Sequence, residues 1–256
     1  MNKLFGTKIQ TIAVMLFINF FALLGIYNIF SSNAIEYWYL YVIVGYICIQ
    51  MLGINAGYHR LICHKSFSVN NIFKRILLFF GIIAGQGSPI FWISVHRSHH
   101  RYEDTDKDIH TPKKGFWHSY VLWTYNILPS EINIKLVPDL LREPDLVFIH
   151  KHYVKLFFAS HIILALISFD IWLYLIMIPT LITLHCSSFQ TSFVHVKKLG
   201  YQNFEKGNSV NCPLVFPLIL GEAWHNNHHG DPKRANFGIK WWEIDPTYWL
   251  IKIIKK

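Results

Sequence analysis

Long apolar runs constrain the fold of this chain more than any other feature. Residues 9–30 are almost wholly apolar, a second run covers residues 37–54, and an apolar block at 156–189 is too long for one membrane crossing. At 1.5 Å per residue, about 20 apolar residues span the ~30 Å hydrocarbon core of a bilayer. Charged residues make up only 15% of the chain, well below the share typical of soluble domains. The sequence therefore predicts an integral membrane protein.

The apolar runs predict four transmembrane helices arranged as two hairpins. The first hairpin pairs residues 9–30 with 37–54, and the second pairs 154–169 with 171–191 across Asp170. The first run is longer than the apolar core of a signal peptide, so we expect it to stay in the protein. The remaining parts, 55–153 and 192–256, are expected to form a helical cap. The fold class is thus an all-α membrane protein with a single domain covering 1–256.

Basic residues give the predicted spans an orientation. The two hairpin tips contain Glu36 and Asp170 but no Lys or Arg. The positive-inside rule then places both termini and the cap in the cytosol, at a bacterial inner membrane or the endoplasmic reticulum. The formal net charge of +9 favours membrane lipid headgroups or an acidic redox donor as partners. Nucleic acid is not expected, because the apolar segments leave no soluble domain with a basic face.

One further apolar stretch, residues 76–95, is interrupted by three glycines and Pro89. A full crossing here would separate the histidine-rich segments on its two sides. We therefore expect a buried or partly membrane-embedded pair of helices that leads into the second of these segments.

Eight of the 15 histidines occur in three short boxes that flank the predicted spans. Residues three and four apart share a helix face, so a His-x-x-His-His triplet can direct several imidazoles to one point. His59 and His64 are about 140° apart on an α-helix, so they can converge only across a helix end or from two sides of one metal. Eight imidazoles exceed the needs of one tetrahedral ion, which predicts two metals. The boxes comprise His59 and His64; His96, His99 and His100; and His225, His228 and His229.

Imidazole donors suit Zn, Cu, Fe or Ni, and the apolar setting favours iron with open positions that can bind O₂. Acidic residues near the boxes are candidates to accept hydrogen bonds from the free imidazole N–H groups. His161 and His185 fall inside predicted spans, where we expect neutral, hydrogen-bonded side chains rather than ligands. The candidate acids are Glu103, Asp104, Asp106, Asp108 and Glu222.

In their sequence context the boxes resemble those of the membrane fatty acid desaturases of the acyl-CoA (Δ9, stearoyl-CoA) type, especially the bacterial members. The similarity covers roughly residues 36–256 and includes the stretches 57–67, 96–108, 115–119, 221–229 and 235–245. It implies a non-haem di-iron centre with nine histidine ligands, of which the ninth is His195. In the family the ninth ligand ends an Asn-Ser-x-x-His motif, whose Asn reaches iron through water; the matching stretch here is residues 191–195. Thr191 occupies that position here and is the implied water-mediated ligand.

The resemblance implies an O₂-dependent enzyme that introduces a cis double bond, Δ9 in this type, into a saturated acyl chain. No catalytic residue beyond the metal ligands is implied, and the electrons come from a separate donor of the ferredoxin or cytochrome b5 type. The charged pairs of the animal CoA-dependent members are replaced by Ser94-Val95 and Ile127-Leu128. The acyl carrier is therefore open between CoA, a carrier protein and a lipid. The alternatives are a histidine-box hydroxylase of lipids or alkanes, and a histidine-rich metal transporter with ligands near the bilayer midplane.

Overall fold

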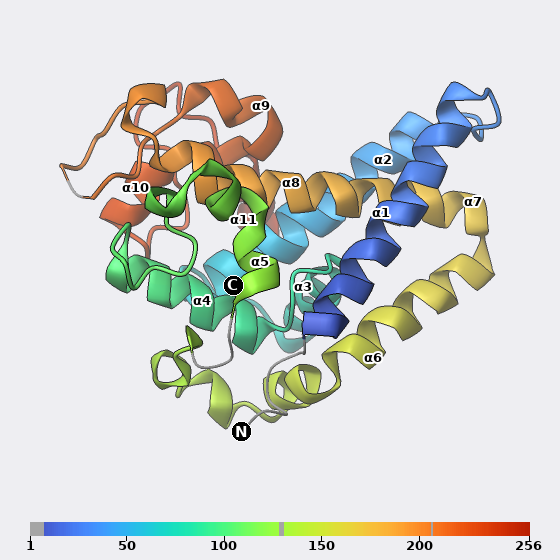
Figure 1. Cartoon of the computed structure of the whole chain (residues 1–256), viewed down its shortest axis with the longest axis horizontal. Helices are drawn as coiled ribbons and strands as arrows, with labels where there is room; N and C mark the ends of the chain where they lie inside the picture. The colour runs from blue at the N-terminus through green and yellow to red at the C-terminus, as the bar shows by residue number, and fades with distance from the viewer. Residues whose placement is uncertain (1–7, 128–130, 206) are drawn as a thin grey trace.

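The chain folds into helices over the residues that the structure describes. A computed structural model gives residues 8–127, 131–205 and 207–256, so that Leu128 lies outside the described part. Extended pairing within these ranges is limited to two isolated bridges, Tyr201 with Asn211 and Asn211 with Trp224. The predicted all-α class is therefore confirmed for the described residues (Figure 1).

The first hairpin consists of two long apolar helices. Helix α1 covers Lys8–Phe30, and α2 (Trp38–Tyr46) runs directly into a π-helix, η1 (Ile47–Cys63). Both Lys8–Phe30 and Trp38–Cys63 are long and apolar enough to cross a membrane. The second helix was predicted to end at residue 54, but it continues to Cys63. Its extension carries His59 on the same rigid element as the span.

The second hairpin breaks slightly earlier than the sequence predicts. Helix α6 (Pro144–Ile167) ends before Ser168, whose side chain accepts a hydrogen bond from the Ile171 backbone N–H. Capping of this kind starts a new helix, and Asp170 in its first turn suits the helix dipole. The elements α7 (Phe169–Trp172), η7 (Leu173–Met177), α8 (Ile178–Ser192) and η8 (Phe193–His195) then form one continuous helical rod.

Three of the four predicted spans are apolar enough to cross a membrane by length and composition. Phe169–His195 is the third, after the two helices of the first hairpin. Helix α6 has 24 residues, but Lys151 and Lys155 lower its hydropathy, and it is not among the three. The prediction of a helical membrane protein is therefore supported by three candidate spans, one fewer than the four predicted.

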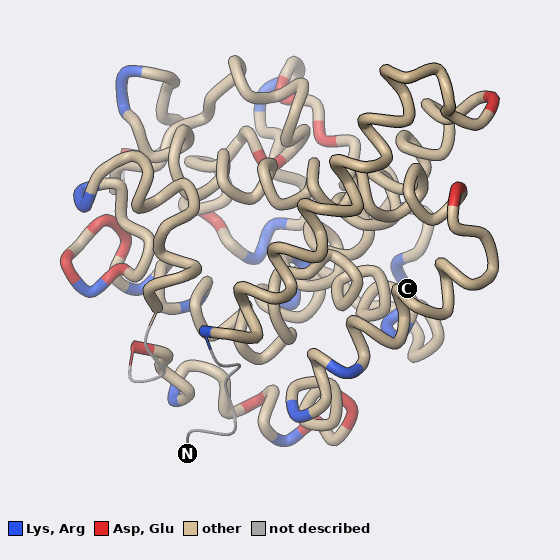
Figure 2. The backbone as a smooth tube through the Cα atoms, turned by 45° about the vertical axis from the view of Figure 1, so that its right-hand side comes forward, with Lys and Arg blue, Asp and Glu red and all other residues tan. Residues whose placement is uncertain are grey.

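Both hairpin tips lie at one end of the molecule, and the short helices of the cap gather at the other end (Figure 1). Figure 2 shows acidic positions at the tips, while Lys and Arg are distributed over the rest of the chain. The two hairpins approach closely. A Cβ atom on Gly45 of α2 would lie 1.9 Å from the Leu175 carbonyl oxygen of η7, so only glycine allows this contact.

The predicted helix pair within residues 76–95 is confirmed. Helix α3 (Asn71–Ile83) packs along η1, and α4 (Pro89–Tyr102) begins where the Ser88 side chain accepts from the Phe91 N–H. Gly85 and Gly87, with φ of 72° and 94°, make the turn between them. Helix α4 thereby carries the second histidine box toward the first. The cap also contains α5 (Trp123–Asn126), α9 (Phe216–Ile219), α10 (His225–Gly230) and α11 (Pro246–Ile254).

Candidate metal centre

The nine histidines predicted as metal ligands lie in two separate groups. Within each group, one ring nitrogen from every member lies within 4.8 Å of the others. The sequence predicts two metals but does not divide the ligands between them. The first group contains His59, His64, His96, His100 and His228, and the second contains His99, His195, His225 and His229.

Helical spacing explains how each triplet contributes to both groups. On α4, His96 and His100 are four residues apart and belong to the first group, whereas His99 belongs to the second. On α10 the assignment is reversed, because His225 and His229 belong to the second group and His228 to the first. Side chains at i and i+4 share a face, and the side chain at i+3 points slightly aside. Each helix therefore lies between the two groups and serves both.

The first box converges across a helix end, which is one of the two arrangements that its spacing allows. His64 directly follows the last residue of η1, and its backbone N–H donates to the His59 carbonyl oxygen at 3.1 Å. This i to i+5 bond is that of a π-turn, a feature often found at functional sites. It brings the two ring centroids to 5.0 Å. His195 enters the second group at the end of η8.

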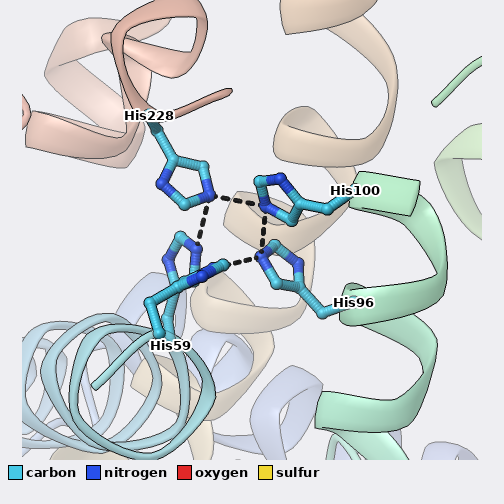
Figure 3. A group of neighbouring side chains, drawn as sticks. His59, His96, His100 and His228 are labelled. Atoms are coloured by element: carbon cyan, nitrogen blue, oxygen red, sulfur yellow. Dashed lines mark hydrogen bonds between the residues drawn. The ribbon is translucent and has the colours of Figure 1, made fainter. Parts of the chain in front are cut away.

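The nitrogen spacing fits bound metal ions. In the first group, His59 Nε2 lies 3.0 Å from His228 Nε2, and His96 Nε2 lies 3.0 Å from those of His64 and His100 (Figure 3). In the second group, His225 Nε2 lies 3.1 Å from His195 Nε2 and 3.0 Å from His229 Nε2. With metal–nitrogen bonds of about 2.1 Å, two ligands at right angles have nitrogens about 3.0 Å apart. The two groups thus have the dimensions of ligand shells.

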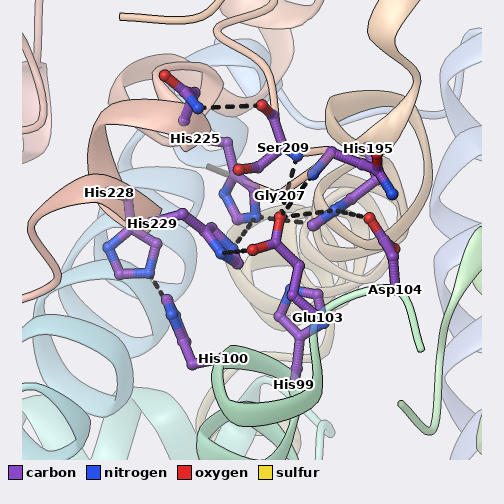
Figure 4. Close-up of polar contacts among 12 residues, drawn as sticks. His99, His100, Glu103, Asp104, His195, Gly207, Ser209, His225, His228 and His229 are labelled. Carbon is purple, nitrogen blue, oxygen red and sulfur yellow. Dashed lines mark hydrogen bonds and ion pairs between the residues drawn. The ribbon is translucent and has the colours of Figure 1, made fainter. Parts of the chain in front are cut away.

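Carboxylates hold the opposite nitrogen of four of these rings. His59 Nδ1 lies 3.0 Å from Glu222, and His99 Nδ1 lies 2.9 Å from Asp108. Glu103 and Asp104 occupy the same place for two ligands of the second group (Figure 4), at 3.0 Å from His229 Nδ1 and 3.3 Å from His195 Nδ1 respectively. Four of the five acids named from the sequence are thereby confirmed as neighbours of the histidines. Asp106 is exposed on the same loop and forms no ion pair among the described residues, so its prediction was wrong.

The carboxylates fix which nitrogen is free to bind a metal. Burial alone would raise the pKa of Asp108 and of Glu222, but neighbouring histidines, and Arg60 beside Glu222, keep both pKa values below their ordinary range. An ionised carboxylate only accepts hydrogen bonds, so the imidazole Nδ1 must carry the proton. The Nε2 lone pairs then face the centre of each group.

Most of the imidazoles are held neutral. Burial, followed by the neighbouring imidazoles, lowers the pKa of His64 to about 2 and that of His96, His100 and His228 well below the usual value. His99 differs, because Asp108 and the other nearby carboxylates raise its pKa despite burial. Its Nε2 is buried and has no hydrogen-bond partner within the described ranges. A buried imidazole nitrogen that contacts no protein donor or acceptor suits a metal ligand.

Arg60 is a structural member of the site that the sequence reasoning missed. Its fully buried guanidinium donates to Glu222 at 2.8 Å and to Asp245 at 2.7 Å, and it lies 3.8 Å from the centroid of the Phe237 ring. Glu222 in turn holds His59. The signal available in the sequence was the position of this charged residue directly after His59. Arg60 connects the first box with the segment that precedes the third and with the carboxy-terminal tail.

His110 was also missed. It is buried with its ring centroid 4.4 Å from that of His99, and its Nδ1 lies 3.8 Å from Asp108. The only signal in the sequence was its position two residues after Asp108, the last residue of the acidic run that follows the second box. The predicted hydrogen bonding of His161 and His185 is confirmed, because His161 accepts from the Trp172 indole N–H and His185 is hydrogen-bonded to the Tyr120 hydroxyl.

A cavity of about 480 Å³ opens onto both histidine groups. Its wall includes His59 and His96 of the first group and His99 and His225 of the second, together with apolar side chains from α1, α4 and α8. Thr191, the implied water-mediated ligand, also lines it. The Thr191 hydroxyl donates to the Ser119 carbonyl oxygen at 2.6 Å. An apolar molecule in this cavity can thus reach the edge of each group.

Comparisons with known proteins agree on one family. The profile described as "Fatty acid desaturase" matches residues 10–253. The chain is 35% identical over 209 residues to an sn-1 stearoyl-lipid 9-desaturase of Anabaena variabilis, covering 80% of this chain and 75% of that protein. It is 34% identical over 254 residues to an sn-1 stearoyl-lipid 9-desaturase of Synechocystis sp., covering 98% and 75%. It is 31% identical over 221 residues to an acyl-CoA 5-desaturase of Anemone leveillei, covering 84% and 67%.

Replacing Arg60 by Met tests whether its charge holds the site together. The R60M change leaves Glu222 and Asp245 buried without their partner, which costs about 3–5 kcal/mol. We expect a markedly lower thermal midpoint in detergent and a loss of bound metal. Arg75→Met is the matched control, because Arg75 and Asp145 form an exposed ion pair at 3.7 Å, worth at most about 1 kcal/mol. Equal midpoints for the two variants would contradict the assignment.

Proposed function

The chain belongs to the fatty acid desaturase family and is a fatty acyl desaturase, and from this premise we propose the details of its reaction. It introduces a cis double bond at Δ9 of a saturated acyl chain, using O₂ and two electrons from a separate donor. The observation that carries this proposal is the pair of adjoining imidazole groups at the edge of an apolar cavity. Two hydrogens leave adjacent methylene carbons, and O₂ is reduced to two molecules of water with two electrons and two protons.

We propose that each histidine group holds one iron ion, with nine histidine ligands in all. Two iron ions, when bound, would supply the O₂ chemistry that breaks unactivated C–H bonds. The second group has one histidine fewer than the first, which supports a water molecule as a further ligand. Thr191 directs its hydroxyl proton to the Ser119 carbonyl, so its lone pairs can accept a hydrogen bond from that water.

A membrane lipid is the acyl carrier that the site supports best. Two of the similar proteins are stearoyl-lipid 9-desaturases by name. The Ser94 and Val95 side chains, at the place of a charged pair in CoA-dependent members, are both buried, and Ser94 donates to the Asn133 carbonyl oxygen at 3.0 Å. Ile127 adds an apolar side chain to the cavity wall. Neither position offers a charge for the phosphates of CoA.

The proposed membrane arrangement has four crossings. Helix α6 would be the third crossing in chain order, because it pairs with the Phe169–His195 rod as α1 pairs with α2 (Figure 1). Glu36 and Asp170 at the tips, without Lys or Arg, support placing the tips outside and the cap, the active site and both termini in the cytosol.

The first histidine group offers an entry point for electrons. His64 and His100 are half-buried, whereas all four members of the second group are buried. These two side chains line a second, open pocket of about 410 Å³, whose charged residues are two cations, Arg97 and Lys233, and one anion, Asp231. We place the donor, a ferredoxin or cytochrome b5 type of protein with an acidic face, over this pocket. Opposite charges would speed its encounter with the desaturase.

Charge reversal at Lys233 tests the docking site. We expect Lys233→Glu to raise the KM for an acidic donor several-fold at low salt, and added salt to remove the difference between the variant and the wild type. Lys114→Glu is the control, because Lys114 is exposed and lines neither cavity. Reduction kinetics that do not respond to salt would count against electrostatic docking.

Lipid profiles of a host that lacks Δ9 unsaturation test the proposed reaction. Expression of the wild-type chain with a supplied donor should yield lipids with cis-9 monoenoic chains. His225→Ala removes a member of the second group and should abolish the product. His118→Gln should retain it, because His118 belongs to neither group and donates to the Ile109 carbonyl oxygen. An unchanged lipid profile, or an alcohol without an alkene, would overturn the proposal; the latter would indicate a hydroxylase.

A further inference from the structure

The wall of the cavity carries positive charge that nothing in the described structure balances. Three of its lining residues are lysines, Lys8, Lys151 and Lys155, and no Asp or Glu lines it within the described ranges. All three lysines are exposed and form no ion pair among the described residues, where six other ion pairs engage Lys or Arg. A cavity with three cationic groups and no anionic one attracts an anion.

The three lysines come from two helices that lie side by side. Lys151 and Lys155 are four residues apart on α6 and therefore share a face. Lys8 is the first residue of α1. The two helices touch where the Phe17 ring meets those of Phe157 and Phe158, with centroids 5.9 and 5.2 Å apart. Beyond this aromatic contact, both helices continue toward the hairpin tips (Figure 1).

This contact also sets the level of Lys155 along the apolar helix α1. Phe17 lies about 14 Å beyond Lys8 along α1, at 1.5 Å per residue. Lys155 precedes Phe157 by two residues, so it lies level with the apolar part of α1 rather than with its end. An unpaired ammonium group at such a depth is costly in a membrane. Its place on the cavity wall gives it access to water or to an anionic ligand.

Other residues of the wall are suited to an acyl chain. Val14 and Met15 of α1, Val95 of α4 and Leu181 of α8 line the cavity, and so do histidines of both groups. The cavity thus combines a cationic region, an apolar wall and the histidine groups. An amphiphile with an anionic head and a long saturated chain matches this distribution of charge.

We propose that Lys8, Lys151 and Lys155 bind the phosphate of an anionic membrane phospholipid, whose acyl chain extends along the cavity to the histidines. The proposal rests on the proposed desaturase function and narrows its substrate to phospholipids with a net negative headgroup. A membrane lipid fits better than a soluble thioester, because α1, one wall of the cavity, has only 22% of its apolar window buried. Such a helix borders lipid, from which the substrate can enter directly.

A binding measurement tests the headgroup preference without turnover. The full chain in detergent is offered equal amounts of distearoyl phosphatidylglycerol, which is anionic, and distearoyl phosphatidylcholine, which is zwitterionic. Native mass spectrometry then gives the ratio of the two bound lipids. We expect wild type to favour the anionic lipid and K151Q/K155Q to reduce this preference on the order of tenfold. K151R/K155R, which keeps the charge, should restore it.

Lys197→Gln/Lys198→Gln is the matched control, because both lysines are exposed and neither lines the cavity. If this control lost the preference as fully as K151Q/K155Q, the lysines would act only through the net charge of the protein, and the proposal would fail. It would also fail if wild type bound the two lipids equally.

Turnover in vesicles that contain both stearoyl lipids separates this proposal from the proposed function. Wild type should place the double bond mainly in the anionic lipid, and K151Q/K155Q should desaturate both lipids equally. Equal desaturation by wild type would overturn the headgroup assignment and leave the desaturase function standing. If stearoyl-CoA were desaturated and neither lipid was, the assignment of a membrane phospholipid to the cavity would be wrong. Absence of any alkene would refute the proposed function, while the binding ratio would still decide the headgroup assignment.

Discussion

The close contacts between carboxylate oxygens and imidazole Nδ1 atoms, 2.9–3.3 Å long, are the interactions on which the site depends. They commit the proton of each ring to one nitrogen and leave the other as a lone pair. Glu222, Asp108, Asp104 and Glu103 do this for His59, His99, His195 and His229. Without them, neutral imidazoles about 3 Å apart could hydrogen-bond to each other in several tautomers. The carboxylates therefore define the ligand groups before any metal arrives.

Buried carboxylates need compensation, and Arg60 provides it at the centre of the cap. Its guanidinium contacts both Glu222 and Asp245, and the ring of Phe237 lies over it. Arginine suits this place because its planar fork can serve two carboxylates at once. The spanning helix that ends at Cys63 is thereby fastened to the carboxy-terminal part of the chain. The candidate span and the two histidine groups thus become one structural unit.

The sequence predicted the histidines that gather in the two groups better than it predicted their surroundings. Periodicity identified the histidine triplets, and the family resemblance supplied His195, because short local patterns encode both. The division into groups of five and four depends on how α4 and α10 face each other, and no local pattern records that packing. The same reason explains why Arg60 was missed, since its partners Glu222 and Asp245 lie far away in the sequence. His110 lies close to Asp108 in the sequence, but no spacing pattern links it to the boxes. The hydropathy pattern placed Asp170 at the helix break, but the capping Ser168 determined it.

The most direct test of the account is the metal content of the purified full chain, isolated from iron-replete cells and measured by elemental analysis. Two complete imidazole groups predict about two iron ions per chain and no comparable amount of zinc or copper. Removing His228 or His225, one from each group, should lower the iron content to about one per chain in either case. A wild-type content of one metal per chain, or of zinc in place of iron, would contradict the two-iron centre.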